Sequence, residues 1–484
     1  MAEIRFVDQT LRDGQQSLWG MRMQAGMALP VVPLIDRVGY DVVDFVGSSM
    51  MEVLVRHCQE DPWEGLDLIV AAMPRSPMRA GVRNTAIISM SVTPDALMDL
   101  WVRTLCRHGV RSFWIYDVLH WNIDKTHRLA KVAKEFGAEV VASLMYTLSP
   151  VHTDAFYAEK ADLLAASPDV DGLLIYDTAG VLTPERARTL IAAVRPRAHG
   201  KYFELHCHAC AGIAPLTYLA AIEAGVTTLH TCARPLANGS SLPSIESMLR
   251  NVRIAGHTAA IEERLLAPIS AHFEAVARAA GLPLGVPVEY DLLLFEHQIP
   301  GGMTGTLRNQ LAEHGMAERL DEVLHEVALV RRELGYPGMA TPFSQLVGTI
   351  AVLNIVSGQR YAVIPDEVVQ YAKGFYGQPV APIDPDILDR IMATPRAALL
   401  PAVPEQPDLE EIRRPHGAVS DEELLLRALI APHFIERMRA AGPVRQDYPL
   451  LASRELDAVR RLMTRSMARQ LDVATEGFAV SLRR

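Results

Sequence analysis

The chain has 484 residues, of which 49% are apolar and 21% charged, a composition typical of soluble globular proteins with a large core. Its net charge is -10 at pH 7, with acidic and basic residues mixed along the chain, so no basic face suggests binding to nucleic acid. Five cysteines, no secretion leader and no apolar run of the ~18 residues needed for a membrane span predict a reduced, cytoplasmic protein without a membrane span.

In the first half of the chain, short apolar or β-branched runs alternate with longer amphipathic segments. This order indicates a parallel sheet covered by helices. Eight such units in about 250 residues predict an α/β fold, a (β/α)8 TIM barrel. A doubly wound open sheet is the competing fold, but it does not need eight units, and no Gly-rich dinucleotide motif is present. The predicted strands are Ile4–Asp8, Asp41–Val46, Ala86–Met90, Ser112–Asp117, Glu139–Tyr146, Gly172–Asp177, Tyr202–His208 and Thr227–Thr231.

After residue 241 the strand alternation stops and the chain becomes mainly helical. We predict a barrel domain over residues 1–290 and a helical C-terminal domain over residues 291–484 that closes the barrel mouth. The predicted C-terminal elements are a Gly/Pro-rich loop at His297–Thr306, a helix at Met316–Leu334, a linker or surface segment at Leu400–His416, and helices at Asp421–Ala441 and Arg454–Gln470.

The first predicted strand ends in the polar stretch Asp8–Ser17, which contains Arg12, Asp13 and Gln16. Buried carboxylates are unfavourable unless an arginine or a metal compensates their charge, so this stretch predicts a binding site. A solvated turn is the alternative. Barrel enzymes carry their chemistry at the C-terminal ends of the strands. These ends form a converging polar ring: Asp8, Arg12, Asp13, Asp44, Asp117, Tyr146, Tyr176, Asp177, His206, His208, Cys232 and Arg234.

The seventh predicted strand ends in His206-Cys-His208. Side chains two residues apart on a strand point to the same face, so both imidazoles can reach one ion. Imidazoles bind borderline divalent ions such as Zn, Mn or Co. A single H-x-H is often incidental, but with Asp13 across the barrel mouth it predicts a site of two histidines and one carboxylate. Cys207 then points into the wall, and a C-x-x-C with Cys210 is the less favoured alternative.

These residues carry a resemblance to a known superfamily. Thr10-Leu-Arg-Asp-Gly-x-Gln16 together with His206-x-His208 resembles the DRE-TIM metallolyases. Longer stretches are similar to its biotin-dependent carboxyltransferase branch, which includes the oxaloacetate decarboxylase alpha subunit, the transcarboxylase large subunit and the carboxyltransferase domain of pyruvate carboxylase. Those stretches are Glu60-Asp-Pro-Trp-Glu64, Ser149-Pro-Val-His-Thr153, His297-Gln-Ile-Pro-Gly-Gly302, Glu333-Leu-Gly-Tyr-Pro337, Thr341-Pro-x-Ser-Gln345 and Lys373-Gly-x-Tyr-Gly377.

The resemblance implies that Asp13, His206 and His208 hold a divalent metal. It also implies that Arg12 and Gln16 orient an enolizable 2-oxo acid such as pyruvate or oxaloacetate, with Asp44 as the acidic partner of the arginine. A cation beside a ketone oxygen stabilises an enolate, which both carboxyl transfer and decarboxylation pass through. Dimers or larger assemblies are typical of this branch, so we expect a homodimer.

The sequence departs from the family pattern at three places. Tyr176 occupies the position of a carbamylated lysine that bridges the metal, and it either binds the ion as a phenolate or caps the site. Trp114 occupies the position of an arginine for the substrate carboxylate, which suggests a larger, flatter or less charged substrate. Gly305 aligns with the hydroxyl residue that relays a proton to biotin, and Thr304 and Thr306 flank it as candidate replacements.

The leading interpretation is a metal-dependent carboxyltransferase or decarboxylase of a 2-oxo-acid-like substrate. The chain contains no biotinyl domain, so any biotin arrives on a separate carrier protein, possible partners being this carrier and a biotin carboxylase. A biotin-independent metal-dependent lyase or aldolase on the same scaffold is the second interpretation. The third is a catalytically silent subunit of a carboxylase complex.

Overall fold

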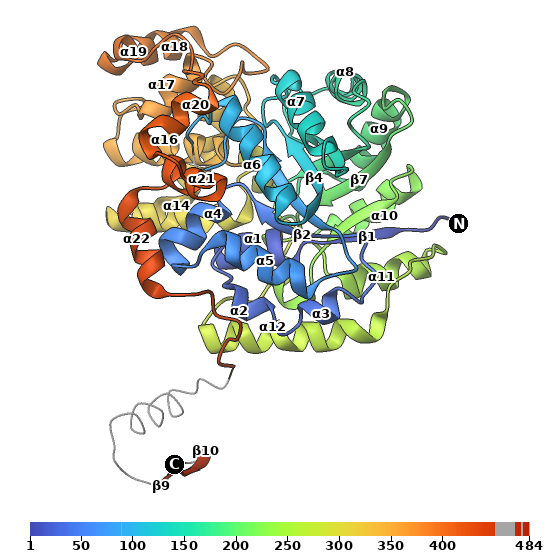
Figure 1. The fold of residues 1–484 in the computed structure, drawn as a ribbon. Coiled ribbons are helices and arrows are strands. Elements are labelled where there is room, and N and C mark those ends of the chain that lie inside the picture. The colour runs from blue at the N-terminus through green and yellow to red at the C-terminus, as the bar shows by residue number, and fades with distance from the viewer. Residues whose placement is uncertain (89, 451–469, 476–477, 484) are drawn as a thin grey trace.

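Eight parallel strands form a closed barrel in which each strand pairs with the next along the chain and β8 pairs with β1 (Figure 1). The computed structural model describes residues 1–88, 90–450, 470–475 and 478–483. The strand interiors are almost entirely buried, as expected for a sheet covered on both faces. The barrel strands are β1 (Arg5–Asp8), β2 (Val42–Gly47), β3 (Met78–Arg83), β4 (Val110–Tyr116), β5 (Glu139–Met145), β6 (Gly172–Asp177), β7 (Tyr202–Cys207) and β8 (Thr228–Thr231).

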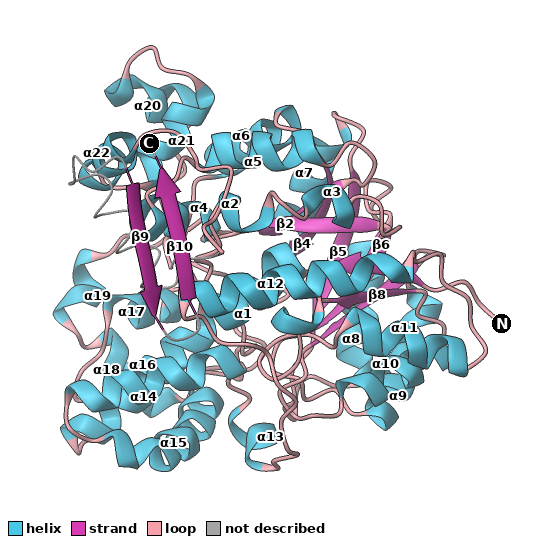
Figure 2. Ribbon diagram, turned by 90° about the horizontal axis from the view of Figure 1, so that it is seen from below, coloured by secondary structure: helices cyan, strands magenta, loops and turns pink. Residues whose placement is uncertain are grey.

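Helices surround the barrel and bury their apolar faces against it (Figures 1 and 2). Side-chain caps fix where several of them begin; the Thr183 hydroxyl, for example, accepts the backbone N–H of Arg186 at the start of α9. The barrel helices are α1 (Gln15–Trp19), α2 (Ala25–Ala28), α3 (Val32–Ile35), α4 (Met50–Val53), α5 (Pro62–Ala72), α6 (Asp95–Arg107), α7 (Ile123–Lys134), α8 (Asp154–Ala165), α9 (Pro184–Val194), α10 (Ala214–Glu223), α11 (Ile245–Ile254) and α12 (Leu266–Ala280). Two π-helical turns, η1 (Thr10–Gly14) and η2 (Leu54–Cys58), follow β1 and α4.

The helices after residue 290 pack in two places. Residues of α14, α15 and α16 share one apolar cluster with Trp114 and Tyr176 at the barrel mouth, whereas α21 and α22 pack on the outer wall of the barrel. A domain division at residue 290 stays a prediction. The helices are α13 (Leu293–His297), α14 (Gly301–Glu313), α15 (Leu320–Glu333), α16 (Phe343–Ser357), α17 (Asp366–Ala372), α18 (Pro385–Met392), α19 (Pro395–Leu399), α20 (Leu409–Arg413), α21 (Asp421–Leu429) and α22 (Pro432–Ala441).

Several predicted C-terminal elements differ from the observed ones. The loop predicted at His297–Thr306 becomes helical from Gly301, because α14 packs Leu307 and Leu311 into the cluster at the barrel mouth. The single helix predicted at Asp421–Ala441 is two helices, since Pro432 starts a new one. A two-stranded antiparallel sheet of β9 (Gln470–Thr475) and β10 (Phe478–Arg483) was not expected. The helix predicted at Arg454–Gln470 lies outside the described residues, apart from Gln470 in β9.

Within the described ranges, no helix is long and apolar enough to cross a bilayer.

The third strand is β3, so the strand predicted at Ala86–Met90 is wrong. Two arginines and a glycine hide β3 from an apolar pattern. Arg79 points into the barrel, where its charge is compensated by Glu204 and Glu139 at 2.7 and 3.0 Å. Gly81 lies opposite Trp114 of β4, and a Cβ atom there would lie 2.5 Å from the indole ring. The glycine therefore makes room for the tryptophan inside the barrel.

Replacing Gly81 with valine is expected to lower the free energy of unfolding by about 1–3 kcal/mol, the usual cost of overpacking a core. The new side chain must displace the indole of Trp114. Urea unfolding of the single variant and of a Gly81→Val/Trp114→Leu double variant measures this, and the double variant should be less than additive. An unchanged unfolding midpoint for Gly81→Val would contradict the packing described for this layer.

Candidate metal centre

Asp13, His206 and His208 come together at the barrel mouth, as the sequence predicts. Asp13 comes from η1, after β1, and the two histidines come from the end of β7. The Nε2 atoms of His206 and His208 lie 3.2 Å apart, and each lies 3.3 Å from a carboxylate oxygen of Asp13. All three side chains are buried. Two imidazole nitrogens and one carboxylate therefore point at a common centre.

The hydrogen bonds around these residues fit a divalent ion. His208 Nδ1 lies 2.6 Å from the carbonyl oxygen of Ser240 and donates its hydrogen there, which leaves Nε2 to face Asp13. Burial would lower the pKa of His208, but Asp13 raises it well above its usual value, so a metal ion would displace the proton of Nε2 when it binds. Asp13 Oδ1 accepts a hydrogen bond from Ser17 at 2.7 Å, whereas Oδ2 accepts none from the described residues. Nitrogen and carboxylate ligands of this kind suit Zn, Mn or Co.

Arg12 determines the charge state of the Asp13 carboxylate. Its Nη2 lies 3.0 Å from Asp13, and its Nε lies 3.4 Å from Asp44 and donates to Gln9 at 3.0 Å. Burial alone would raise the pKa of Asp13, but Arg12 and His208 hold this pKa well below its usual range. Asp13 is thus ionised, the form that binds metal.

Trp114 of β4 contacts both Asp44 and Arg12 inside the barrel. The indole Nε1 donates to Asp44 at 2.8 Å, and the Arg12 guanidinium carbon lies 4.9 Å from the ring centroid. Tyr116 stacks on the indole at 4.9 Å with an interplanar angle of 19°. Because Arg12 and Tyr116 both pack on the indole, Trp114 is only 1% exposed, although it borders the cavity. Its predicted contact with substrate stays a prediction.

Tyr176 lies against Asp13, His206 and His208, the candidate metal-ligand group. Its ring centroid is 4.7 Å from that of His206 and 4.8 Å from that of Trp114. Burial raises the pKa of the Tyr176 hydroxyl above its usual value, although Arg12 opposes this shift. The protein environment alone therefore keeps Tyr176 a neutral phenol, and only a bound cation would lower its pKa enough to make it a phenolate ligand. Whether Tyr176 is a cap or a ligand stays a prediction.

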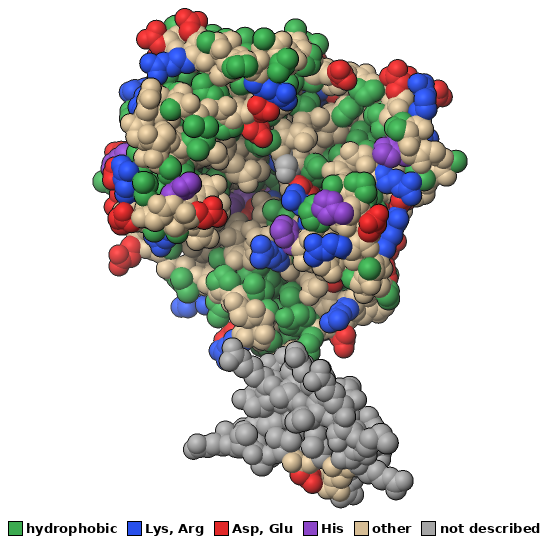
Figure 3. Space-filling model, turned by 90° about the vertical axis from the view of Figure 1, so that its left-hand side faces the viewer, with side chains coloured by type: hydrophobic (Ala, Val, Ile, Leu, Met, Phe, Trp, Pro, Cys, Tyr) green, Lys and Arg blue, Asp and Glu red, His purple; other side chains and the backbone are tan. Residues whose placement is uncertain are grey.

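A cavity of about 500 Å³ opens at the C-terminal ends of the strands, next to these residues. Figure 3 views the molecule from the side on which the barrel strands end and shows a hollow there, with basic and histidine side chains near it. The predicted site residues that line the cavity are Arg12, Asp13, Gln16, Trp114, Tyr176, His208 and Thr306, whereas Asp44, His206 and Thr304 do not. Thr306 lies on α14, as does the exposed Gly305. Arg83, Arg56 and His57 also line the cavity and were not predicted. Arg83 lies on β3, so finding that strand would have found it.

Most of the remaining predicted polar ring does not reach the cavity. Asp117 accepts the backbone N–H groups of its own loop, and Asp177 accepts those of Gly180 and Leu182. The other members are a buried Tyr146, a buried Cys232 and an exposed Arg234. Asp8 accepts a hydrogen bond from Thr10 at 2.6 Å and so supports the end of β1. All five cysteines are free, and Cys207 points to Asp177 in the wall.

A further unpredicted histidine, His230 of β8, lies directly behind the metal-ligand group. Its Nδ1 is 3.0 Å from Nδ1 of His206, and its Nε2 is 2.8 Å from Glu204. Burial would raise the pKa of Glu204, but Arg79 and His230 lower it to about 2. Burial also lowers the pKa of His230, against the effect of Glu204. A single histidine in an apolar strand gives no sequence signal for such a contact.

Two family models match the chain. One, described as a conserved carboxylase domain, matches residues 294–481, and one described as HMGL-like matches residues 114–271. The pyruvate carboxylase B subunit of Methanocaldococcus jannaschii is 35% identical, and the match covers 89% of this chain and 76% of that protein. The 2-oxoglutarate carboxylase large subunit of Hydrogenobacter thermophilus is 34% identical over 88% of this chain and 67% of that protein.

A third relative is the methylmalonyl-CoA carboxyltransferase 5S subunit of Propionibacterium freudenreichii subsp. shermanii, 31% identical over 91% of this chain and 89% of its own length. Among solved structures, the carboxyl transferase domain of Rhizobium etli pyruvate carboxylase with oxamate and biotin superposes with a TM-score of 0.81. That match covers 91% of this chain and 78% of the other at 24% identity, and it supports the fold alone.

Proposed function

Because this chain belongs to the biotin-dependent carboxyltransferase family within the DRE-TIM superfamily, and is an enzyme of the carboxyl-transfer or decarboxylation type, we propose that it moves a carboxyl group to or from a small 2-oxo acid. The observation that carries this proposal is the convergence of Asp13, His206 and His208 beside a cavity that also contains Arg12, Gln16 and Arg83. The barrel mouth is where enzymes of this fold carry their chemistry.

The chemistry requires negative charge to be stabilised on a ketone oxygen. When the carboxyl group leaves the carbon next to the ketone, the bonding electron pair moves toward that oxygen and gives an enolate. A divalent ion held by Asp13, His206 and His208 would supply a positive charge at this oxygen. Arg83, which lines the same cavity, has the fork geometry suited to the substrate carboxylate. Gln16, which also lines the cavity, supplies an amide donor.

We propose that biotin reaches this cavity on a separate carrier protein. The relatives named as B subunit, large subunit and 5S subunit support this arrangement, because each name describes one component of a larger enzyme. A biotin carboxylase would complete the assembly. The five free cysteines support a reduced, cytoplasmic location. A homodimer remains an expectation from the family resemblance.

The test combines the purified chain with oxaloacetate and a biotin carrier protein, and it measures CO2 release. The matched control is the same carrier with its biotin-bearing lysine replaced. Release that requires the biotinylated carrier supports the proposal. Equal release with both carriers indicates the biotin-independent lyase. Tyr176 and Trp114 suggest this outcome, because they stand at the positions of the family's lysine and arginine. No release of CO2 and no carboxyl transfer to pyruvate, 2-oxobutyrate or 2-oxoglutarate would overturn the proposed function.

The role of Tyr176 gives a separate prediction. If Tyr176 is a neutral cap, Tyr176→Phe should leave the Kd for Co²⁺ within about twofold of wild type, because no ligand is lost. The phenyl ring keeps the packing against His206 and Trp114. Calorimetric titration of metal-free protein measures the Kd. A loss of affinity comparable to that of Asp13→Ala would instead identify a phenolate ligand.

A further inference from the structure

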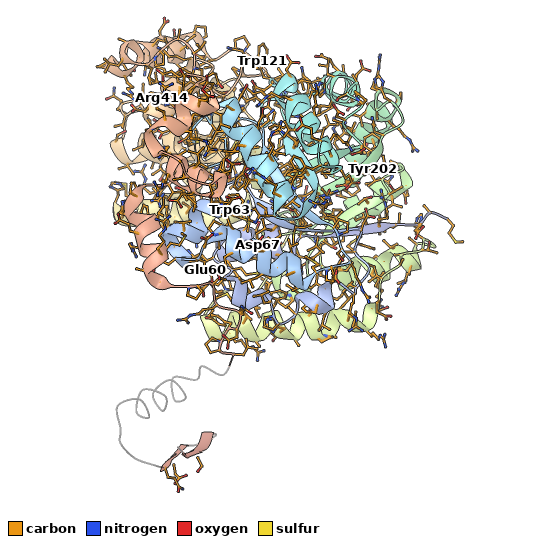
Figure 4. All side chains as sticks on the ribbon, viewed as in Figure 1. Glu60, Trp63, Asp67, Trp121, Tyr202 and Arg414 are labelled. Carbon is orange, nitrogen blue, oxygen red and sulfur yellow. The ribbon has the colours of Figure 1, made fainter. Side chains whose placement is uncertain are left out.

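A column of polar side chains fills the barrel interior below the proposed metal site. It begins with Tyr202, which is labelled in Figure 4 on the side of the barrel where β1 starts. Each member hydrogen-bonds the next at 2.6–3.1 Å in the order Tyr202, Glu139, Arg79, Glu204, His230 and His206. Arg79, Glu204 and His230 are completely buried. The column therefore connects a buried ion pair to one of the three proposed ligands.

The position of the proton on His230 follows from its partners. Glu204 accepts two hydrogen bonds from Arg79, at 2.7 and 3.1 Å, and is an ionised acceptor. The nitrogen facing it, Nε2 of His230, must therefore carry a hydrogen. On the other side of the ring, the amide nitrogen of Gln9 lies 2.9 Å from His230 Nδ1 and can only donate, so Nδ1 is an unprotonated acceptor. Arg79 and Glu204 together select this tautomer.

The position of the proton on His206 follows from its partner, His230. His206 Nδ1 faces the unprotonated Nδ1 of His230 at 3.0 Å, so it carries its own hydrogen and donates it. Gln9 Nε2 approaches the same acceptor at 2.9 Å and also donates to Asp44 at 2.9 Å. With its hydrogen on Nδ1, His206 can offer the lone pair of Nε2 to an ion at the centre that it shares with Asp13 and His208.

We propose that His230 is a positioning residue that holds His206 in the tautomer and orientation required to bind a divalent metal. This inference rests on the metal site of the proposed function and adds a second residue, Glu204, which acts through His230. Carboxylate–histidine–metal arrangements of this kind commonly tune metal affinity by roughly 10- to 100-fold. Here the carboxylate reaches the ligand through an additional imidazole.

The experiment measures the Kd for Co²⁺ of metal-free protein by calorimetry, together with the Tm of the metal-free form. We expect His230→Phe to raise the Kd roughly 10- to 100-fold, because it leaves the Nδ1–H of His206 without an acceptor. His230→Gln, which keeps one acceptor and one donor on a planar amide, should restore most of the affinity. Ser112→Ala is the matched control: Ser112 is equally buried in the column and bonds Arg79, but it does not contact the ligands.

A purely structural role for His230 would lower the Tm of the metal-free form without a selective change in Kd. If wild type binds Co²⁺ and a folded His230→Phe binds it equally well, the inference fails while the proposed metal site stands. If wild type binds no divalent ion, the proposed metal site itself fails. Should His230→Phe not fold, Glu204→Asp decides: it keeps the charge but withdraws the carboxylate from His230, and an unchanged Kd would overturn the inference.

Discussion

His206→Ala is expected to abolish stable metal binding while leaving the barrel folded. The substitution removes one of three converging ligands, so the Kd for a divalent ion should rise by roughly 100-fold or more, beyond the 10- to 100-fold typical of residues that only orient a ligand. Without the ion, the negative charge that develops on a ketone oxygen loses its main stabilisation, and carboxyl transfer should fall with it. Metal analysis after dialysis and a carboxyl-transfer assay measure the two effects.

His120→Ala is the matched control for His206→Ala. His120 is also a buried histidine of the barrel, and burial lowers its pKa to about 3, but it accepts the backbone N–H of Met145 away from the metal-ligand group. Removing its imidazole should reduce stability without reducing metal content. Full metal occupancy in His206→Ala, or an equal loss of metal in both variants, would contradict the proposed ligand set.

Arg79→Leu is expected to cause a larger loss of stability than Gly81→Val on the same strand. It leaves Glu204 as a completely buried carboxylate without its cation, and breaking a buried ion pair in this way typically costs about 3–5 kcal/mol. Urea unfolding of the metal-free protein measures the loss. Arg5→Leu is the control, since Arg5 pairs with Asp41 near the surface, where such pairs contribute about 1 kcal/mol or less.

The pH dependence of the same variant provides a second measurement. In wild type, the pKa of Glu204 is lowered from 4.5 to about 2, so its ion pair contributes stability above pH 4.5 that is lost as the pH falls toward 2. Without Arg79, burial should raise the pKa of Glu204 above its unfolded value, and stability should be lost as the pH rises. The difference in unfolding free energy between wild type and Arg79→Leu should therefore grow between pH 4 and 7. A constant difference would contradict a dominant Arg79–Glu204 pair.

The sequence predicted the barrel because most strands are continuous apolar runs, which only a sheet buried on both faces requires. It failed at β3, where Arg79 and Arg83 look solvent-exposed. The charge of Arg79 is acceptable only because Glu204, which is 125 positions away in the chain, lies beside it in the closed barrel. Gly81 adds no strand signal either, because its part in β3 is to make room for Trp114. Such compensation between distant residues leaves no local pattern.

The candidate site was likewise predicted only in part. Asp13, His206 and His208 were predicted to meet because their positions at strand ends fix their relative placement in a barrel. The hydrogen bond of Trp114 to Asp44 was not predicted, because it depends on which side chain fills each layer of the barrel interior. His230 was missed because a single histidine in an apolar strand is usually a core residue. Polar residues in barrel interiors thus became interpretable only once their partners were known.

Asp13, His206 and His208 are proposed to hold a metal ion at the centre of a carboxyltransferase. Elemental analysis of the purified wild-type protein, dialysed against metal-free buffer, tests this claim most directly when oxaloacetate decarboxylation is followed on the same sample. We expect close to one Zn, Mn or Co ion per chain, with activity lost on chelation and restored by the ion. A protein that contains no divalent metal, binds none on titration and is equally active after chelation would contradict the claim.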